Sequence, residues 1–201
     1  MQYPKEIGQL IESFSKLPGI GNKTATRLAF FVLNMDNNDV KEFSSALTKS
    51  KEDVTFCSIC GNITSRDMNP CAICSDSSRD QTTIFVVEDS QAVMAIENTN
   101  DYHGLYHVLN GVINPMQGIG PNDINMASLL SRLKNHPEVD EVIAGLDATP
   151  EGEATSMYMA RLIKPSGIKM TTLARGLSMG ANLDYADSIT LSRAVSGRIE
   201  L

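Results

Sequence analysis

The chain contains four cysteines, and they stand in two pairs of the same spacing. Cys57 and Cys60 form one Cys-x-x-Cys pair, and Cys71 and Cys74 form the second after ten intervening residues. Each pair can fold into a tight knuckle, and two knuckles can present four thiolates to one tetrahedral zinc ion. Two local disulfides or four small buried side chains are the alternatives. Because four thiolates would leave zinc no open position for water or substrate, the spacing predicts one structural Zn²⁺ per chain.

A second group of residues, Leu17–Arg27, has the composition of a phosphate-binding turn. Its Leu-Pro-Gly-Ile-Gly sequence separates two apolar patterns of helical period. Gly19 and Gly21 allow positive φ and a close approach of a ligand to the backbone, and the N–H groups of the next helix point toward an anion. Lys23 and Arg27 lie on one face of that helix, where they can neutralise phosphates without reading bases. The turn predicts sequence-independent DNA contact; a plain connector with solvated charges is the alternative.

Acidic side chains follow two of the predicted strands. Glu88 ends the first strand, Asp147 follows the third, and Glu151 and Glu153 come shortly afterwards. Ligands of open α/β sheets gather at the carboxyl ends of strands, and carboxylates suit hydrated Mg²⁺. These four residues are therefore a candidate Mg²⁺ site. Alternatively, Glu151 and Glu153 simply favour the first turn of a helix, beside the positive end of its dipole.

The elements that must position these residues fall into two kinds. Apolar spacings of three and four predict helices over residues 5–17, after the glycine turn, and over about 39–53. The inner side of the third helix is expected to carry Val40, Phe43, Leu47 and Val54. After the cysteines, strands are predicted at 82–87, 106–109, 141–146 and 169–173. Three helices are predicted in this part: one that Ser90 caps, one near 126–133 and one over 153–164. The expected fold class is multidomain, α and then α/β with a mainly parallel sheet and a short helical tail.

Charge is distributed unevenly along the 201 residues, which carry a formal net charge of −7. Residues 1–56 hold seven Lys/Arg and seven Asp/Glu, whereas residues 57–201 hold ten and seventeen. Only the amino-terminal end is therefore suited to a polyanion. The sequence has no apolar run typical of a signal peptide or a membrane span, so a cytoplasmic protein without a membrane partner is expected.

Six segments, in chain order, support a family resemblance: Leu17–Arg27, Cys57–Cys74, Val86–Glu88, Glu151–Thr155, Leu173–Leu177 and Leu183–Arg198. Together they resemble the bacterial RecR family of recombination mediator proteins, over essentially the whole chain. The resemblance implies a helix-hairpin-helix DNA-binding domain (1–53), a C4-type zinc finger (54–80), a Toprim domain (81–176) and an oligomerisation tail (177–201).

The same resemblance implies a function and partners. Members of this family form homotetrameric rings wide enough for DNA, and they act with RecO and RecF to help load RecA at single-stranded gaps. Lys23 and Arg27 match the DNA-contacting basic positions, and the four cysteines match the zinc ligands. Glu88 and its acidic neighbours match the Toprim face that meets RecO.

Asp147 departs from the family pattern, because RecR relatives usually have Asn there. Catalytic Toprim proteins such as topoisomerases and primases carry an Asp-x-Asp pair before a Glu-Gly-Glu sequence, and this chain has only the first Asp. The departure favours Mg²⁺ binding, but neither a Tyr placed for strand transfer nor a helper base is evident. A non-enzymatic clamp is the main expectation. A Mg-dependent nuclease or primase-like enzyme and a pure protein adaptor are the alternatives.

Overall fold

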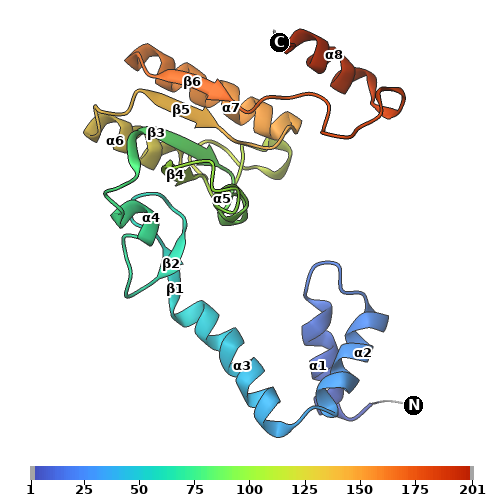
Figure 1. Ribbon diagram of the computed structural model, residues 1–201. Helices are drawn as coiled ribbons and strands as arrows, with labels where there is room; N and C mark the ends of the chain where they lie inside the picture. The colour runs from blue at the N-terminus through green and yellow to red at the C-terminus, as the bar shows by residue number, and fades with distance from the viewer. Residues whose placement is uncertain (1–2, 200–201) are drawn as a thin grey trace. The chain divides into compact units, whose positions relative to one another are not determined.

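The computed structural model describes residues 3–199, and the chain divides into two compact units, Met1–Val54 and Thr55–Leu201 (Figure 1). The first unit contains three helices: α1 (Lys5–Ser15), α2 (Asn22–Leu33) and α3 (Asn37–Glu52). The second unit contains the remaining helices: α4 (Ala72–Ser75), α5 (Ser90–Glu97), α6 (Met126–Asn135), α7 (Pro150–Ile163) and α8 (Ser188–Ser196). The strands are β1 (Val54–Phe56), β2 (Ile63–Ser65), β3 (Asp80–Val87), β4 (Gly104–Val108), β5 (Glu141–Ala144) and β6 (Lys169–Thr172).

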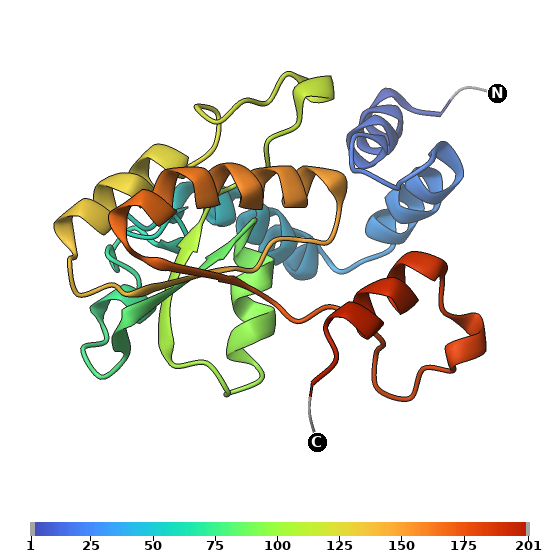
Figure 2. The same cartoon turned by 90° about the horizontal axis from the view of Figure 1, so that it is seen from above.

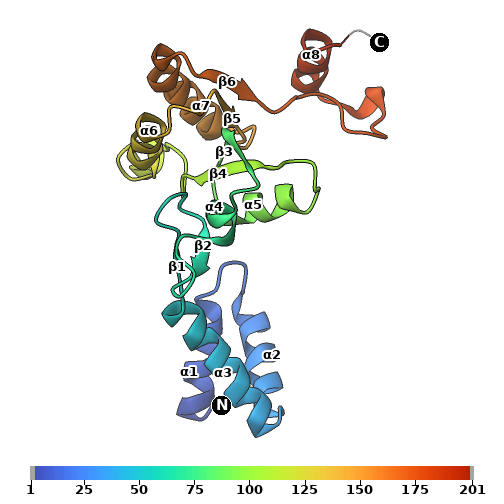
Figure 3. The ribbon, with the colours of Figure 1, turned by 60° about the vertical axis from the view of Figure 1, so that its left-hand side comes forward.

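Helices α1 and α2 form a hairpin and lie side by side (Figure 3). Ile11 of α1 packs against Ala25 and Ala29 of α2, and all three are buried. The two alanines allow the helices to approach closely, because a methyl group is the smallest side chain that still contributes apolar surface. The turn between the helices contains Gly19 in the left-handed region, at φ 79°. The predicted helical hairpin is confirmed.

Helix α3 differs from its prediction. No residue of α3 is buried, and its apolar side chains Phe43 and Leu47 are 46% and 58% exposed. Val54, which follows the helix, is also exposed. Val40 is half-buried, but the other three residues of the expected inner side are left exposed by the described residues 3–199. The periodicity predicted the helix correctly but could not say what packs against its apolar stripe.

The second unit is built on a four-stranded sheet of order β4-β3-β5-β6 in which every pair is parallel. Helices α6 and α7 cover one face, and α5 covers the other (Figure 2). Residues of β3 alternate between the two layers: Ile84 and Val86 pack under α6 and α7, and Phe85 and Val87 pack under α5. The predicted α/β domain with a parallel sheet is confirmed. No helix within residues 3–199 is long and apolar enough to cross a membrane.

Candidate zinc centre and nucleic-acid interface

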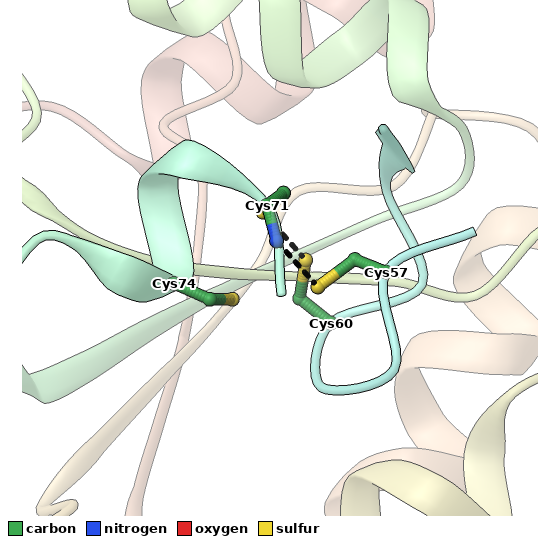
Figure 4. A group of neighbouring side chains, drawn as sticks. All are labelled: Cys57, Cys60, Cys71 and Cys74. Carbon is green, nitrogen blue, oxygen red and sulfur yellow. Dashed lines mark hydrogen bonds between the residues drawn. The ribbon is translucent and has the colours of Figure 1, made fainter. Parts of the chain in front are cut away.

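The four cysteines gather at one point, as their spacing predicts (Figure 4). Their sulfur atoms all lie within 4.8 Å of one another, and no disulfide joins them. Sulfur atoms at zinc–sulfur distances of about 2.3 Å in a tetrahedron are about 3.8 Å apart, and Cys60 Sγ and Cys71 Sγ are 3.6 Å apart. The backbone N–H of Cys71 donates to Cys57 Sγ over 3.3 Å. Hydrogen bonds of this kind commonly orient the ligands of a metal. The donor set fits tetrahedral zinc.

Hydrogen bonds among the thiols shift their pKa values in different directions. The hydrogen bond between Cys60 and Cys71 is the largest cause of a raised pKa at Cys60 and of a lowered pKa at Cys71. Bonding to the same two thiols also raises the pKa of Cys74. A single thiolate is favoured because adjacent thiolates repel each other. A divalent cation cancels that repulsion and allows all four groups to ionise, so zinc binding releases protons and weakens as the pH falls.

The finger is attached to the edge of the large sheet. The N–H of Val108, at the end of β4, donates to the carbonyl of Cys60 over 2.7 Å, and Asn110 Nδ2 donates to the carbonyl of Gly61. Ile73 of α4 packs against both the cysteine cluster and the core under α5. The finger therefore belongs to the same compact unit as the sheet. The helical hairpin, by contrast, has its own small core.

Ser90 takes part in this attachment instead of capping α5 as predicted. The side chain of Asp89 accepts the N–H of Ala92 and caps the helix. The hydroxyl of Ser90 accepts the N–H of Ile63, in β2 of the finger. Asp89 precedes the helix with the extended backbone of an N-cap residue, which places its carboxylate over the first turn.

We predict that Gly61→Ala separates the finger from the sheet. Gly61 has φ +75°, and an added Cβ would lie 2.7 Å from the carbonyl oxygen of Val108. The free energy of unfolding should fall by about 2 kcal/mol or more in denaturant titrations, from backbone strain and the clash together. Gly118→Ala is the matched control, because Gly118 has φ +74° and open space around its Cα. Equal losses in the two variants would show that the contact with Val108 contributes nothing.

The amino end of α2 presents the predicted phosphate-binding groups. Within residues 3–199, no side chain caps this end, so the first-turn N–H groups are available to an anion. Lys23 and Arg27 are exposed, and neither forms an ion pair with any described residue. Unbonded N–H groups and unpaired cations thus lie within the first half of one helix. This arrangement can hold a phosphate backbone without base contacts.

The two glycines of the turn have different roles. Gly19 requires its positive φ, but Gly21 has φ −77°, an extended backbone that any residue can adopt. Gly21 therefore does not use the positive φ that glycine allows. A Cβ at Gly21 would meet no atom within 4 Å, so the protein's own packing does not require glycine there either. Because Gly21 has no side chain, a ligand can approach the first turn of α2 closely.

Three of the four predicted acidic residues lie together. Glu88, Asp147 and Glu151 line a hollow of about 310 Å³ at the carboxyl ends of the strands, with Thr149 between them. Burial raises the pKa of Glu88 above its usual value, and the charges of Asp147 and Asp89 raise it further. Among residues 3–199, no ion pair neutralises the charges of Glu88, Asp147 or Glu151. A cation or a basic side chain from a partner would relieve their repulsion.

Glu153 does not belong to this acidic group. Its Oε1 atom accepts hydrogen bonds from Arg175 and Arg193, which lower its pKa. Helix α7 begins at Pro150, so Glu151 and Glu153 both lie in its first turn. Glu153 connects α7 to the tail segment that contains α8. The sequence contained no signal for this cluster, because Arg175 and Arg193 lie 22 and 40 residues from Glu153.

The acidic hollow differs from the zinc centre in the spacing of its ligand atoms. Within the described chain, the four cysteines are the one group of three or more His, Cys, Asp or Glu side chains placed closely enough to share a metal ion. The carboxylates of the hollow are more widely spread. They remain a candidate Mg²⁺ or docking site.

Comparison with known proteins gives matches along most of the chain. Family models match in this order: the RecR helix-hairpin-helix (residues 7–51), the RecR four-cysteine zinc finger domain (54–76), the Toprim domain (82–174) and the RecR C-terminal region (176–199). Three relatives, each named recombination protein RecR, align over all 201 residues of both chains. They come from Oenococcus oeni (67% identical), Leuconostoc mesenteroides (63%) and Pediococcus pentosaceus (60%). With the geometry of the sulfur atoms, the zinc-finger match confirms the predicted structural Zn²⁺.

Proposed function

The chain belongs to the RecR family of recombination proteins, and on that premise we propose that it is a non-enzymatic DNA clamp. In this proposal it acts with RecO and RecF to help load RecA onto gapped single-stranded DNA. The observation that carries the proposal is the uncapped, basic amino end of α2, where Gly21, Lys23 and Arg27 leave donors and charges free for phosphates. The contact is independent of base sequence, because backbone N–H groups and point charges meet only phosphate oxygens.

Assembly would multiply this contact. One hairpin supplies two basic side chains, which is a weak site, but several hairpins in one ring bind the same DNA with avidity. Apolar side chains left exposed on α3 and α8 support such an assembly. These include Phe43, Leu47, Ile189 and Val195, which are between 46% and 65% exposed. Exposed apolar surface of this extent is typical of a protein contact, and we propose a homotetrameric ring.

The acidic hollow would serve as the docking surface for a basic partner. Burial raises the pKa of Glu88, and the charge of Asp147 raises it further. Glu88, Asp147 and Glu151 line one hollow, and no ion pair within residues 3–199 gives any of them a counter-charge. A lysine or arginine of RecO would supply it. Because the DNA-binding residues and the acidic residues lie in different units of the chain, one protein can hold DNA and a partner at the same time.

A Mg-dependent Toprim enzyme is the second candidate. The observation in its favour is that Glu88 and Asp147 line the same hollow. Glu151 also lines the hollow, and its carboxylate can act as a base. The other described residues of the lining are glycine, threonine, amides and aliphatic side chains, which supply no nucleophile of the Tyr type. Cleavage of gapped DNA in Mg²⁺ or Mn²⁺ that is lost in Asp147→Ala would favour the enzyme over the clamp.

A RecA-loading assay tests the proposed function. On gapped DNA covered by single-stranded-DNA-binding protein, the chain with RecO and RecF should shorten the lag before RecA hydrolyses ATP. Glu88→Ala should restore the lag by weakening the complex with RecO while leaving DNA binding intact, because the hairpin has its own core. If the lag were the same with and without the chain, the clamp proposal would be wrong. If Lys23→Ala changed nothing while Glu88→Ala abolished loading, the chain would be a pure adaptor.

A further inference from the structure

The outer face of α2 carries aromatic side chains next to its cations. At 100° per residue, Lys23, Arg27, Phe30 and Phe31 fall within about one third of the helix circumference, opposite the buried Ala25 and Ala29. All four outer residues are exposed, and Phe31 is 66% exposed. Cations and aromatic rings therefore share one solvent-facing surface, which we call the α2 outer face.

The positions of these side chains along α2 match the chemistry of a nucleic-acid strand. Phe31 lies one turn after Arg27 and two turns after Lys23, so about 6 Å of helix separates each residue from the next. Phe30 is held in place by an edge-on contact with Tyr3, with ring centroids 5.6 Å apart. A strand whose phosphates lie at the two cations would bring its bases within reach of the rings.

We propose that Phe31, which follows the Phe30 ring that Tyr3 contacts, is a stacking platform for unpaired DNA bases. This inference rests on the proposed function, and it names the form of DNA that the hairpin prefers. Aromatic rings stack on any base, because every base has a π-face, so the platform keeps the contact independent of sequence. In blunt duplex DNA the base faces are already stacked and cannot reach Phe31. The α2 outer face therefore favours single-stranded and gapped DNA over duplex.

The charges around the ring favour DNA over a second protein chain as its occupant. Phe31 follows Arg27 by one turn, whereas the exposed Phe43 of α3 follows Asp39 by one turn. The phosphates of a DNA strand would be attracted to Arg27 beside Phe31 and repelled by Asp39 beside Phe43. The two phenylalanines thus have neighbouring charges of opposite sign.

The absence of Trp from the sequence allows a direct optical test. Phe31→Trp introduces a single indole, whose fluorescence should be quenched by an unpaired oligonucleotide and by gapped DNA, with little quenching by blunt duplex of the same sequence. Phe56→Trp, at a ring of similar exposure (59%) in β1 of the finger, is the control and should respond to none of them. Phe31→Ala should weaken single-strand binding about fivefold or more while changing duplex binding less than about twofold. Phe31→Leu keeps the apolar surface and should behave like Phe31→Ala.

Three results would overturn the platform. Equal quenching by duplex and single strand would mean that the ring does not read unpaired bases. Phe31→Ala could instead have a smaller native mass and lose affinity equally for single-stranded and duplex DNA, with both effects reversed in Phe31→Leu. That result would assign the face to a second copy of the chain. If no quenching occurred while DNA binding still depended on Lys23 and Arg27, the platform proposal would be wrong and the clamp proposal would stand. If the wild-type protein bound neither DNA form, both proposals would fail.

Discussion

Replacement of Cys71 by Ser should release the zinc ion and leave residues 54–76 without ordered structure. Structural zinc contributes about 10 kcal/mol or more to the folding of small fingers at neutral pH, and without it they are unfolded. The finger has no apolar core of its own apart from this site, because its buried cluster consists of the cysteines themselves with Ile73 packed against them. The expected effect is the largest of any single substitution in the chain.

Amide hydrogen exchange measures this loss, with metal content determined by mass spectrometry. The N–H groups of Cys57 and Gly61, which bond within the first knuckle, should lose their protection. The N–H of Val108 should lose it too, although Val108 lies in the large sheet, because its acceptor is the carbonyl of Cys60. Helices α1 and α2 should keep their protection, since their core is separate.

Ser58→Ala is the control for the cysteine variant. Ser58 lies within the same knuckle but its side chain is exposed, so zinc and amide protection should both be retained. If Cys71→Ser lost its zinc and the finger amides nevertheless stayed protected, the ion would not be what folds this segment.

Joint replacement of Lys23 and Arg27 by Ala should weaken DNA binding by about tenfold to a hundredfold for each chain engaged. Each charged group removed costs about 1.5–3 kcal/mol when it is hydrogen-bonded to a phosphate, and less where solvent screens the contact. The dependence on salt should also flatten. The slope of log affinity against log salt decreases by about 0.7–0.9 for each phosphate contact that is lost.

Fluorescence anisotropy between about 50 and about 200 mM salt measures both quantities. The matched control is Lys41→Ala with Lys49→Ala, which removes the same charge from exposed positions of α3. That control should change the slope little, because α3 has no uncapped turn beside its lysines; Asp36 caps its amino end. An identical loss in the two double variants would mean that net charge, and not the α2 outer face, determines binding.

Local patterns predicted the elements of this fold well. Helix and strand periods depend on neighbours within one or two turns, and these produced the hairpin, the alternating strands and the parallel sheet. The first turn of α7 illustrates the limit. The sequence placed Glu151 and Glu153 near a helix start, but only the fold separates them. Glu151 lines the acidic hollow, and Glu153 accepts hydrogen bonds from Arg175 and Arg193.

The cysteine spacing by itself determined the zinc ligands, because two Cys-x-x-Cys knuckles need only a short connection to meet at one ion. Likewise, the spacing of Lys23 and Arg27 placed both on one helix face. Tertiary structure alone decided which surfaces are free: that α3 buries no residue, that Glu153 is paired, and that the finger joins β4. These outcomes depend on contacts between residues distant in sequence, which no local period encodes.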